Sequence, residues 1–196
     1  IGLYDQGLKE YQIAFDLRES LFGAESKEAL LSKGRLGRAL DRMGRQDEAI
    51  EMFRQQIEGM SLVVSLEDPD LLKAKIDLSG VHRERGQFAE AEVLLAEVID
   101  GSSIVSAEHS NLSVSAKVAM GQLVRAQGDP TGGEQWFVDA LADLDQMEGV
   151  DHVRRQSIQY NVAISKAIQN QTEEAIVMLR QLLEDRESTL GVDHPQ

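Results

Sequence analysis

Large apolar residues recur along the chain at a constant interval of 42 positions. One such column consists of Tyr11, Phe53, Leu95, Phe137 and Leu179, and a second column, four positions further on, consists of Phe15, Ile57, Ile99, Leu141 and Leu183. Residues four apart lie on the same face of an α-helix, so each pair indicates one amphipathic helix. The interval holds without insertion or deletion, which predicts a chain built from equal repeats.

Small residues predict a second helix in each repeat and the turn that joins the two helices. One small-residue column, each member preceded by an apolar residue, consists of Gly37, Ser79, Gly121 and Ala163, and another consists of Ala49, Ala91, Gly133 and Ala175. Such residues let two helices approach closely. Between the two columns lies a turn column, which consists of Gly44, Gly86, Gly128 and Asn170. Glycine there supplies the left-handed backbone conformation that ends the first helix.

We therefore expect an all-α fold of about nine helices, in which each repeat has a first helix (helix A) and a second helix (helix B). The expected A helices are residues 28–43, 70–85, 112–127 and 154–169, and the expected B helices are residues 5–20, 47–60, 89–100, 131–148 and 173–188. Residues 1–196 then form a single array, which consists of a partial repeat 1–27 and the repeats 28–69, 70–111, 112–153 and 154–195. One repeat cannot bury its apolar face alone, so neighbours are expected to stack. Neither end shows a polar capping helix, which predicts exposed apolar surface and a route to self-association.

Residues between the repeats carry signals for the start of a helix. Ser26, Asp68 and Ser110 share one column, and each is expected to be the N-cap of the following helix A. Pro69 and Pro195 are expected at the first helical position, where a missing N–H costs nothing. Pro130, next to two glycines, is expected to delay its helix B and to create a weak point.

The segment Gly86-Gln87-Phe88-Ala89-Glu90-Ala91 has the pattern Gly-x-Tyr/Phe-x-Glu-Ala at the start of helix B. This pattern resembles the tetratricopeptide repeat. The 42-residue period, together with the linker Leu190-Gly191-Val192-Asp193-His194-Pro195, resembles the kinesin-light-chain-like subclass of that family. The resemblance implies a right-handed α-solenoid whose concave groove is lined mainly by the A helices. It also implies a non-catalytic module that binds segments of other proteins.

The formal net charge is −14, which argues against nucleic acid and anionic membrane as partners. The charge is sorted by helix, because the expected A helices hold 13 Lys and Arg against 5 Asp and Glu, whereas the expected B helices hold 5 against 22. Since the resemblance places the A helices in the groove, we expect a basic groove that binds an acidic peptide or protein.

The residues expected to point into this groove, by the geometry of the related repeats, are Arg35, Arg38, Arg42, Asp77, Arg83, Gln122, Arg125 and Asn161. Arginine suits this role because its planar guanidinium group binds carboxylates bidentately. Reversal of Arg38 and Arg83 to glutamate is therefore expected to abolish binding of an acidic partner. In the alternative interpretation, these cations cover apolar surface with their stems and pair with glutamates of the B helices.

Residues that carry chemistry form no recognisable catalytic or metal-binding motif. The chain has no cysteine, and the histidines of the expected linkers, which are His109, His152 and His194, lack the spacing of zinc ligands. We therefore expect no enzyme activity, no cofactor and no metal. Among the remaining residues, His82 is expected at a half-packed helix position and Trp136 in the core. The column Lys33, Lys75, Lys117 and Gln159 is expected to turn outward.

The expected location is the cytoplasm. The absence of cysteine fits a reducing compartment, and no apolar run approaches the roughly 18–20 residues that a membrane span requires. Two roles other than peptide binding stay open. The array could regulate a larger signalling protein, such as an NTPase or a kinase, or it could be a structural spacer that assembles with itself.

Overall fold

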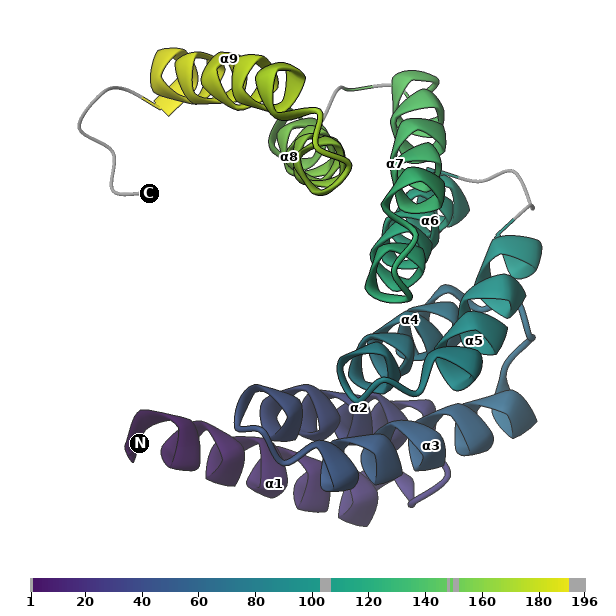
Figure 1. The fold of residues 1–196 in the computed structure, drawn as a ribbon. Coiled ribbons are helices and arrows are strands. Elements are labelled where there is room, and N and C mark those ends of the chain that lie inside the picture. Colours follow the sequence, from purple (N-terminus) through teal and green to yellow (C-terminus); the bar gives the residue numbers. More distant parts are fainter. Residues whose placement is uncertain (1, 103–106, 148, 150–151, 191–196) are drawn as a thin grey trace. The chain divides into compact units, whose positions relative to one another are not determined.

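Every regular element in the described part of the chain is an α-helix (Figure 1). The computed structural model describes residues 2–102, 107–147, 149 and 152–190. It divides into two compact units, Ile1–Leu112 (unit 1) and Ser113–Gln196 (unit 2), and the boundary lies within one helix. The expected all-α fold is confirmed. The expectation that residues 1–196 form a single array stays a prediction.

Unit 1 contains five complete helices and the start of a sixth. These helices are α1 (Gly2–Phe22), α2 (Lys27–Arg42), α3 (Gln46–Val63), α4 (Pro69–Glu84), α5 (Phe88–Gly101) and the first turns of α6 (Ala107–Ala126). Each helix from α1 to α4 packs against the helix that follows it. In addition, α2 contacts α4. The helices α2 and α4 are therefore neighbouring A helices, whereas α1, α3 and α5 are B helices.

Unit 2 contains the remainder of α6 and three further helices. These are α7 (Pro130–Asp145), α8 (His152–Ile168) and α9 (Thr172–Leu190). The pairs α7–α8 and α8–α9 are in contact. Here α6 and α8 are A helices, and α7 and α9 are B helices.

The turn between helix A and helix B has the same backbone in every repeat. Gly44, Gly86, Gly128 and Asn170 all have a positive φ, between 64° and 95°. One residue later, a backbone N–H reaches back to a carbonyl of the last turn of helix A. Arg45 donates in this way to Leu40 at 2.9 Å, and Gln171 donates to Lys166 at 2.9 Å. This bond satisfies a carbonyl that the end of the helix leaves without a partner, so the left-handed turn predicted at Gly44, Gly86 and Gly128 is confirmed.

Two of the three predicted N-caps are confirmed. The Ser26 hydroxyl accepts from the Ala29 N–H, and the Asp68 carboxylate accepts from the N–H groups of Asp70 and Leu71. The prediction for Ser110 is wrong, because α6 begins three residues earlier, at Ala107. His109 lies in this additional turn, and its Nε2 is 2.9 Å from the Glu67 carbonyl oxygen, which attaches the turn to the preceding linker.

The prolines behave as helix starters. Pro69 occupies the first turn of α4 as expected, whereas Pro195 lies outside the described residues. The expected delay at Pro130 is wrong, because α7 begins at Pro130, in the same register as α3 and α5. The reason is local: proline loses nothing at the first helical position, and the Asp129 side chain caps the helix by accepting from the Gly132 N–H at 2.8 Å.

Small residues allow helices A and B to pack around large side chains in both units. A β-carbon on Gly37 would lie 3.1 Å from the Phe53 ring, and one on Gly121 would lie 2.7 Å from the Phe137 ring. Phe53 and Phe137 are completely buried in their clusters. The predicted small-residue columns are therefore confirmed as close-approach positions.

The large apolar column does not form a core along its whole length. Phe53, Leu95 and Phe137 are buried, but Tyr11 is 43% exposed. Tyr11 lies on α1, whose main contacts are with α2, whereas Phe53 on α3 lies between α2 and α4. The column therefore contributes to the core at Phe53, Leu95 and Phe137, but not at Tyr11.

Two predictions about polar residues on the A helices are also wrong. Lys75 and Lys117 do not turn outward: Lys75 is buried with its Nζ 2.8 Å from Glu97, and the Lys117 Nζ lies 2.6 Å from Asp143. The acidic residues of the adjacent helix B draw these ammonium groups inward. His82 is fully buried rather than half-packed, since its Nδ1 lies 2.8 Å from the side-chain oxygen of Gln87.

Candidate functional site

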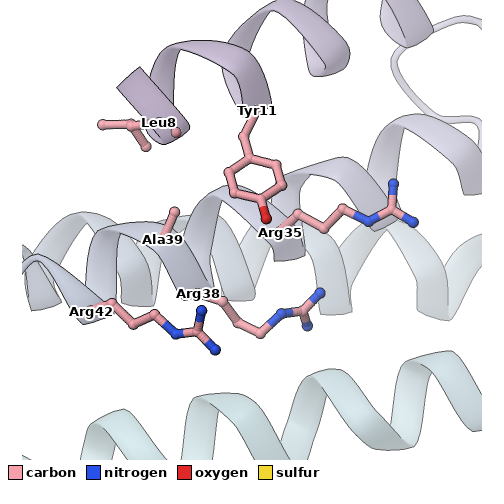
Figure 2. Close-up of a pocket in the computed structure, with 7 residues that line it drawn as sticks. Leu8, Tyr11, Arg35, Arg38, Ala39 and Arg42 are labelled. Atoms are coloured by element: carbon pink, nitrogen blue, oxygen red, sulfur yellow. The ribbon is translucent and has the colours of Figure 1, made fainter. Parts of the chain in front are cut away.

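Three arginines follow one another along α2. Arg35, Arg38 and Arg42 have the spacing i, i+3 and i+7, which places them on one face of the helix (Figure 2). Arg35 and Arg42 are exposed, and the side chain of Arg38 is 38% exposed. We call these three residues the arginine ridge.

A cavity of about 330 Å³ lies beside the arginine ridge. Its lining consists of Gly7, Leu8, Tyr11, Arg35, Arg38, Ala39 and Arg42. Figure 2 shows Leu8 and Tyr11 on α1 and the arginines and Ala39 on α2. The site therefore combines three cations with an apolar residue and a half-exposed tyrosine, a composition that suits a ligand with both charged and apolar parts.

The three arginines differ in how they are paired. The Arg38 Nη1 donates to the Asp77 Oδ2 of α4 at 2.6 Å, and the Asp77 side chain is 23% exposed. Arg35 and Arg42 form no side-chain hydrogen bond or ion pair with any residue that the structure describes. Two guanidinium groups of the ridge are thus available to a ligand, and the central one is engaged.

The facing helix α4 carries carboxylates at two of the positions equivalent to the ridge. Forty-two residues after Arg35 and Arg42 stand Asp77 and Glu84. The positive charge of the A helices is therefore unevenly distributed in unit 1: it is concentrated on α2, whereas α4 has carboxylates at the positions equivalent to Arg35 and Arg42.

The two carboxylates of α4 contribute to the raised pKa of Asp41 on α2. Its Oδ1 is buried without a hydrogen-bond partner among the described residues. Burial raises the pKa of the Asp41 carboxyl, and the negative charges of Glu84 and Asp77 raise it further. Arg42 and Arg83 act in the opposite direction and lower this pKa.

The remaining predicted groove residues have other neighbours. On α4, the Arg83 Nη2 lies 3.4 Å from the Glu84 Oε1. In unit 2, Arg125 donates to the Asn161 backbone carbonyl at 3.1 Å and to its Oδ1 at 3.0 Å. Gln122 is half-buried on α6. The structure brings together Arg35, Arg38, Arg42 and Asp77 in unit 1, and Arg125 with Asn161 in unit 2.

Several other cations of the A helices are engaged by carboxylates. The Lys27 Nζ lies 3.0 Å from Asp68 and 2.9 Å from Asp70, and the hydrogen bonds that it donates to Asp70 and then to Asp68 raise its pKa. The Lys166 Nζ lies 3.0 Å from Glu174, the larger cause of its raised pKa, and also contacts Glu134. These pairs match the alternative interpretation of the basic A helices. Lys27 and Lys166 thus connect helices, in contrast to Arg35 and Arg42, which have no ion-pair partner among the described residues.

The residues on α1 were missed by the sequence interpretation. Tyr11 shares a column with Phe53, which suggests a packing position rather than a ligand contact. Leu8 was not singled out, since helix B was expected outside the groove. Only their exposure, which depends on the number of neighbouring helices, reveals them as part of the cavity.

Two apolar surfaces lie elsewhere. On α1, Ile13, Leu17 and Leu21 form a stripe with 60%, 56% and 65% exposure. In unit 2, a cavity of about 340 Å³ between α8 and α9 is lined by Gln156, Ser157, Tyr160, Leu179, Leu182, Leu183 and Arg186. Tyr160 and Leu183 are both about half exposed, at 52% and 46%.

The described residues contain no group of three or more His, Cys, Asp or Glu side chains able to hold a metal ion. None of the helices searched in this part of the chain is both long enough and apolar enough to span a membrane.

Known proteins share this architecture. Two models of the tetratricopeptide repeat match the chain, one over residues 1–61 and the other over residues 71–107 and 157–196. Together these ranges cover more than half of the sequence. The chain belongs to the tetratricopeptide repeat family. No curated protein matches it in sequence.

Solved structures of kinesin-light-chain-like repeats have a similar fold. Two crystal structures of nearly identical repeats from a protein of Podosopora anserina assigned as a kinesin light chain have TM-scores of 0.76 and 0.73. Both are 20% identical to this chain, and each match covers 96% of this chain and 89% of the solved chain. BtubC (BKLC) from P. vanneervenii has a TM-score of 0.78 at 20% identity, and the match covers 99% of this chain and 80% of BtubC.

These likenesses confirm the expected fold, an α-solenoid of kinesin-light-chain-like tetratricopeptide repeats. Proteins of this family are generally scaffolds without catalytic activity. Their stacked helices present extended binding surfaces. This chain is accordingly a protein-interaction repeat module.

Proposed function

We propose that the protein binds an acidic segment of another protein on the arginine ridge of α2. The observation that carries this proposal is the pair of exposed guanidinium groups, Arg35 and Arg42, which line one cavity and have no ion-pair partner among the described residues. A guanidinium group left without a partner next to a cavity favours a carboxylate ligand.

Charge alone gives such a site little affinity. An exposed ion pair contributes about 0–1 kcal/mol, so binding has to combine both free arginines with apolar contact. Leu8, Tyr11 and Ala39 supply that contact in the same cavity. The segment should therefore carry at least two carboxylates and an apolar side chain or proline between them.

The spacing of the free arginines favours one backbone form of the ligand. Arg42 lies seven positions after Arg35 on the helix, a rise of about 10 Å. In a polyproline II segment, residues three apart point to the same side and are about 9 Å apart. Two glutamates in a Glu-Pro-Pro-Glu segment would thus face both arginines at once.

The test uses a fluorescein-labelled, proline-rich peptide with a Glu-Pro-Pro-Glu core, and its Gln-Pro-Pro-Gln form as the uncharged control. Fluorescence anisotropy gives the affinity for the wild type and for the double variant Arg35→Glu/Arg42→Glu. We expect a loss of at least tenfold, and a wild-type affinity that falls with rising salt, because screening weakens exposed charge pairs.

The matched control is Lys9→Glu/Arg54→Glu, which makes the same change in net charge at exposed positions outside the cavity lining. It should retain the affinity within about twofold, since distant exposed charges are screened. Equal losses in both double variants, or equal binding of the glutamate and glutamine peptides, would contradict the proposal.

A second candidate function is self-association through the apolar surfaces of α1 and of α8–α9. The stripe Ile13, Leu17 and Leu21 is more than half exposed, which is unusual for three successive helical turns of one apolar face. The variant Leu17→Glu/Leu183→Glu should abolish any concentration-dependent mass increase in sedimentation analysis. Leu62→Glu, at an 80% exposed leucine of α3, is the control. A wild type that stays monomeric at high concentration would exclude this candidate.

A further inference from the structure

The central arginine of the proposed site is already bound to a carboxylate of the protein itself. The Arg38 Nη1 and the Asp77 Oδ2 are 2.6 Å apart, within the range of a charge-assisted hydrogen bond. Asp77 reaches the ridge from the neighbouring A helix, α4, so the ion pair also connects two repeats.

An acidic ligand on the ridge would place its own carboxylates beside this pair. The Arg38 side chain is 38% exposed and lines the cavity, whereas the Asp77 side chain is 23% exposed. A ligand carboxylate can thus approach Arg38 from solvent, but it then meets the charge of Asp77 in a partly desolvated environment. Like charges at such close range repel each other and disfavour the complex.

We propose that Asp77 is an internal competitor of the acidic ligand, which occupies Arg38 in the free protein and lowers the affinity of the arginine ridge. This inference rests on the proposed function and specifies its regulation. A ligand that arrives at the free protein contacts Arg35 and Arg42 first. It engages Arg38 only when Asp77 releases it, so any change that draws Asp77 away from Arg38 strengthens binding.

The rival interpretation is that Asp77 positions Arg38 for the ligand. The two interpretations predict opposite signs for the isosteric substitution Asp77→Asn. If Asp77 is a competitor, the Asp77→Asn variant should bind the Glu-Pro-Pro-Glu peptide about threefold to fivefold more tightly than the wild type. This is the size of effect expected for one exposed ion pair. As a positioning residue, it should give a variant that binds more weakly.

The matched control is Glu84→Gln, which removes the same charge seven residues further along α4. The carboxylate of Glu84 contacts Gln46 and Arg83 rather than the ridge. Its substitution should change the affinity by less than about twofold, as expected of a general change in screened surface charge.

A double-mutant cycle isolates the contact between the two residues. In the Arg38→Gln background, Asp77→Asn should have no larger effect than Glu84→Gln, because no arginine remains to be released. Circular dichroism melting curves confirm that each variant is folded. A full threefold gain that persists without Arg38 would overturn the proposal, and so would a weaker affinity of Asp77→Asn in the wild-type background.

The outcomes also separate this proposal from the proposed function. If the peptide binds the wild type through Arg35 and Arg42 but Asp77→Asn brings no gain, only the competition is wrong. If the wild type does not bind and Asp77→Asn does, the competition is supported, but the proposal that the wild type binds through Arg35 and Arg42 alone is wrong. If neither protein binds the peptide, both proposals are wrong.

Discussion

Helices α2 and α8 are both A helices, yet they present different surfaces. At the positions of Arg35, Arg38 and Arg42, helix α8 carries Asn161, Ile164 and Ile168. Ile168 is 53% exposed. The face of α2 is therefore cationic, whereas the face of α8 is neutral and partly apolar.

The buried positions of the same two helices are alike. Leu36 and Gly37 of α2 are buried, as are Val162 and Ala163 of α8. The repeat therefore fixes the residues that pack against helix B and leaves those on the other face of helix A unconstrained. Fold and binding preference are thus determined by different residues of one helix.

The strongest test of this comparison concerns the shared core. We expect Phe53→Ala in unit 1 and Phe137→Ala in unit 2 to cost about 3–5 kcal/mol each, since both remove a fully buried ring. Urea denaturation followed by circular dichroism measures both losses, and the fluorescence of Trp136, the only tryptophan, follows unit 2. The exposed neighbours give the controls Arg54→Ala and Val138→Ala, which should stay within about 0.5 kcal/mol of the wild type. A loss below that size for either phenylalanine would show that the two cores are not equivalent.

The faces are compared by peptide affinity. Arg35→Gln should weaken binding of the Glu-Pro-Pro-Glu peptide about fivefold, or about 1 kcal/mol, because it removes one exposed charge pair. In unit 2, Gln122→Ala and Asn161→Ala should each leave the affinity within about twofold. If either substitution matched Arg35→Gln, the acidic ligand would extend to unit 2 and the contrast between the faces would fail. Anisotropy titrations at two salt concentrations provide the measurement.

The smallest expected effect concerns Asp41, whose position in the next repeat is held by Arg83. Burial, Glu84 and Asp77 raise the pKa of the Asp41 carboxyl in the folded protein, so its ionised form opposes folding near neutral pH. Asp41→Asn should therefore stabilise the protein at pH 7, by less than about 1 kcal/mol because solvent screens much of the interaction.

This gain should shrink as the pH falls through the folded-state pKa of Asp41, because the wild-type carboxyl then takes up a proton and loses its penalty. Thermal melting at pH 7 and at successively lower pH values measures the difference. Asp16→Asn, on the exposed part of α1, is the control. A variant less stable than the wild type at pH 7 would contradict the raised pKa.

The sequence predicted the fold well because the constraints on it are local and periodic. The turn at Gly44 and its equivalents needs a left-handed backbone, and Gly121 has no room for a β-carbon, so both columns are visible at a 42-residue interval. Ser110 failed as an N-cap because the contact between His109 and Glu67, which extends α6, depends on folding between segments far apart in the sequence.

The candidate site was predicted in part. The arginines of α2 could be named from their charge and helical spacing. Their pairing could not be predicted, because Asp77 and Arg38 belong to different helices and form their ion pair only in the folded protein. Tyr11 was hidden by its column, since a periodic pattern does not show how many neighbours a particular helix has.

The separation of core and face positions within each A helix has a consequence for how such a protein changes over time. Mutations at Arg35, Asp77, Ala119 and Asn161, which share one column, leave the buried columns untouched. Substitutions at exposed positions such as Arg35 are close to neutral for folding. Duplication of a repeat, followed by drift at its face, can thus create a new binding preference without a period of instability, and the four residues now found in this column are already charged in two different senses, small, or amide-bearing.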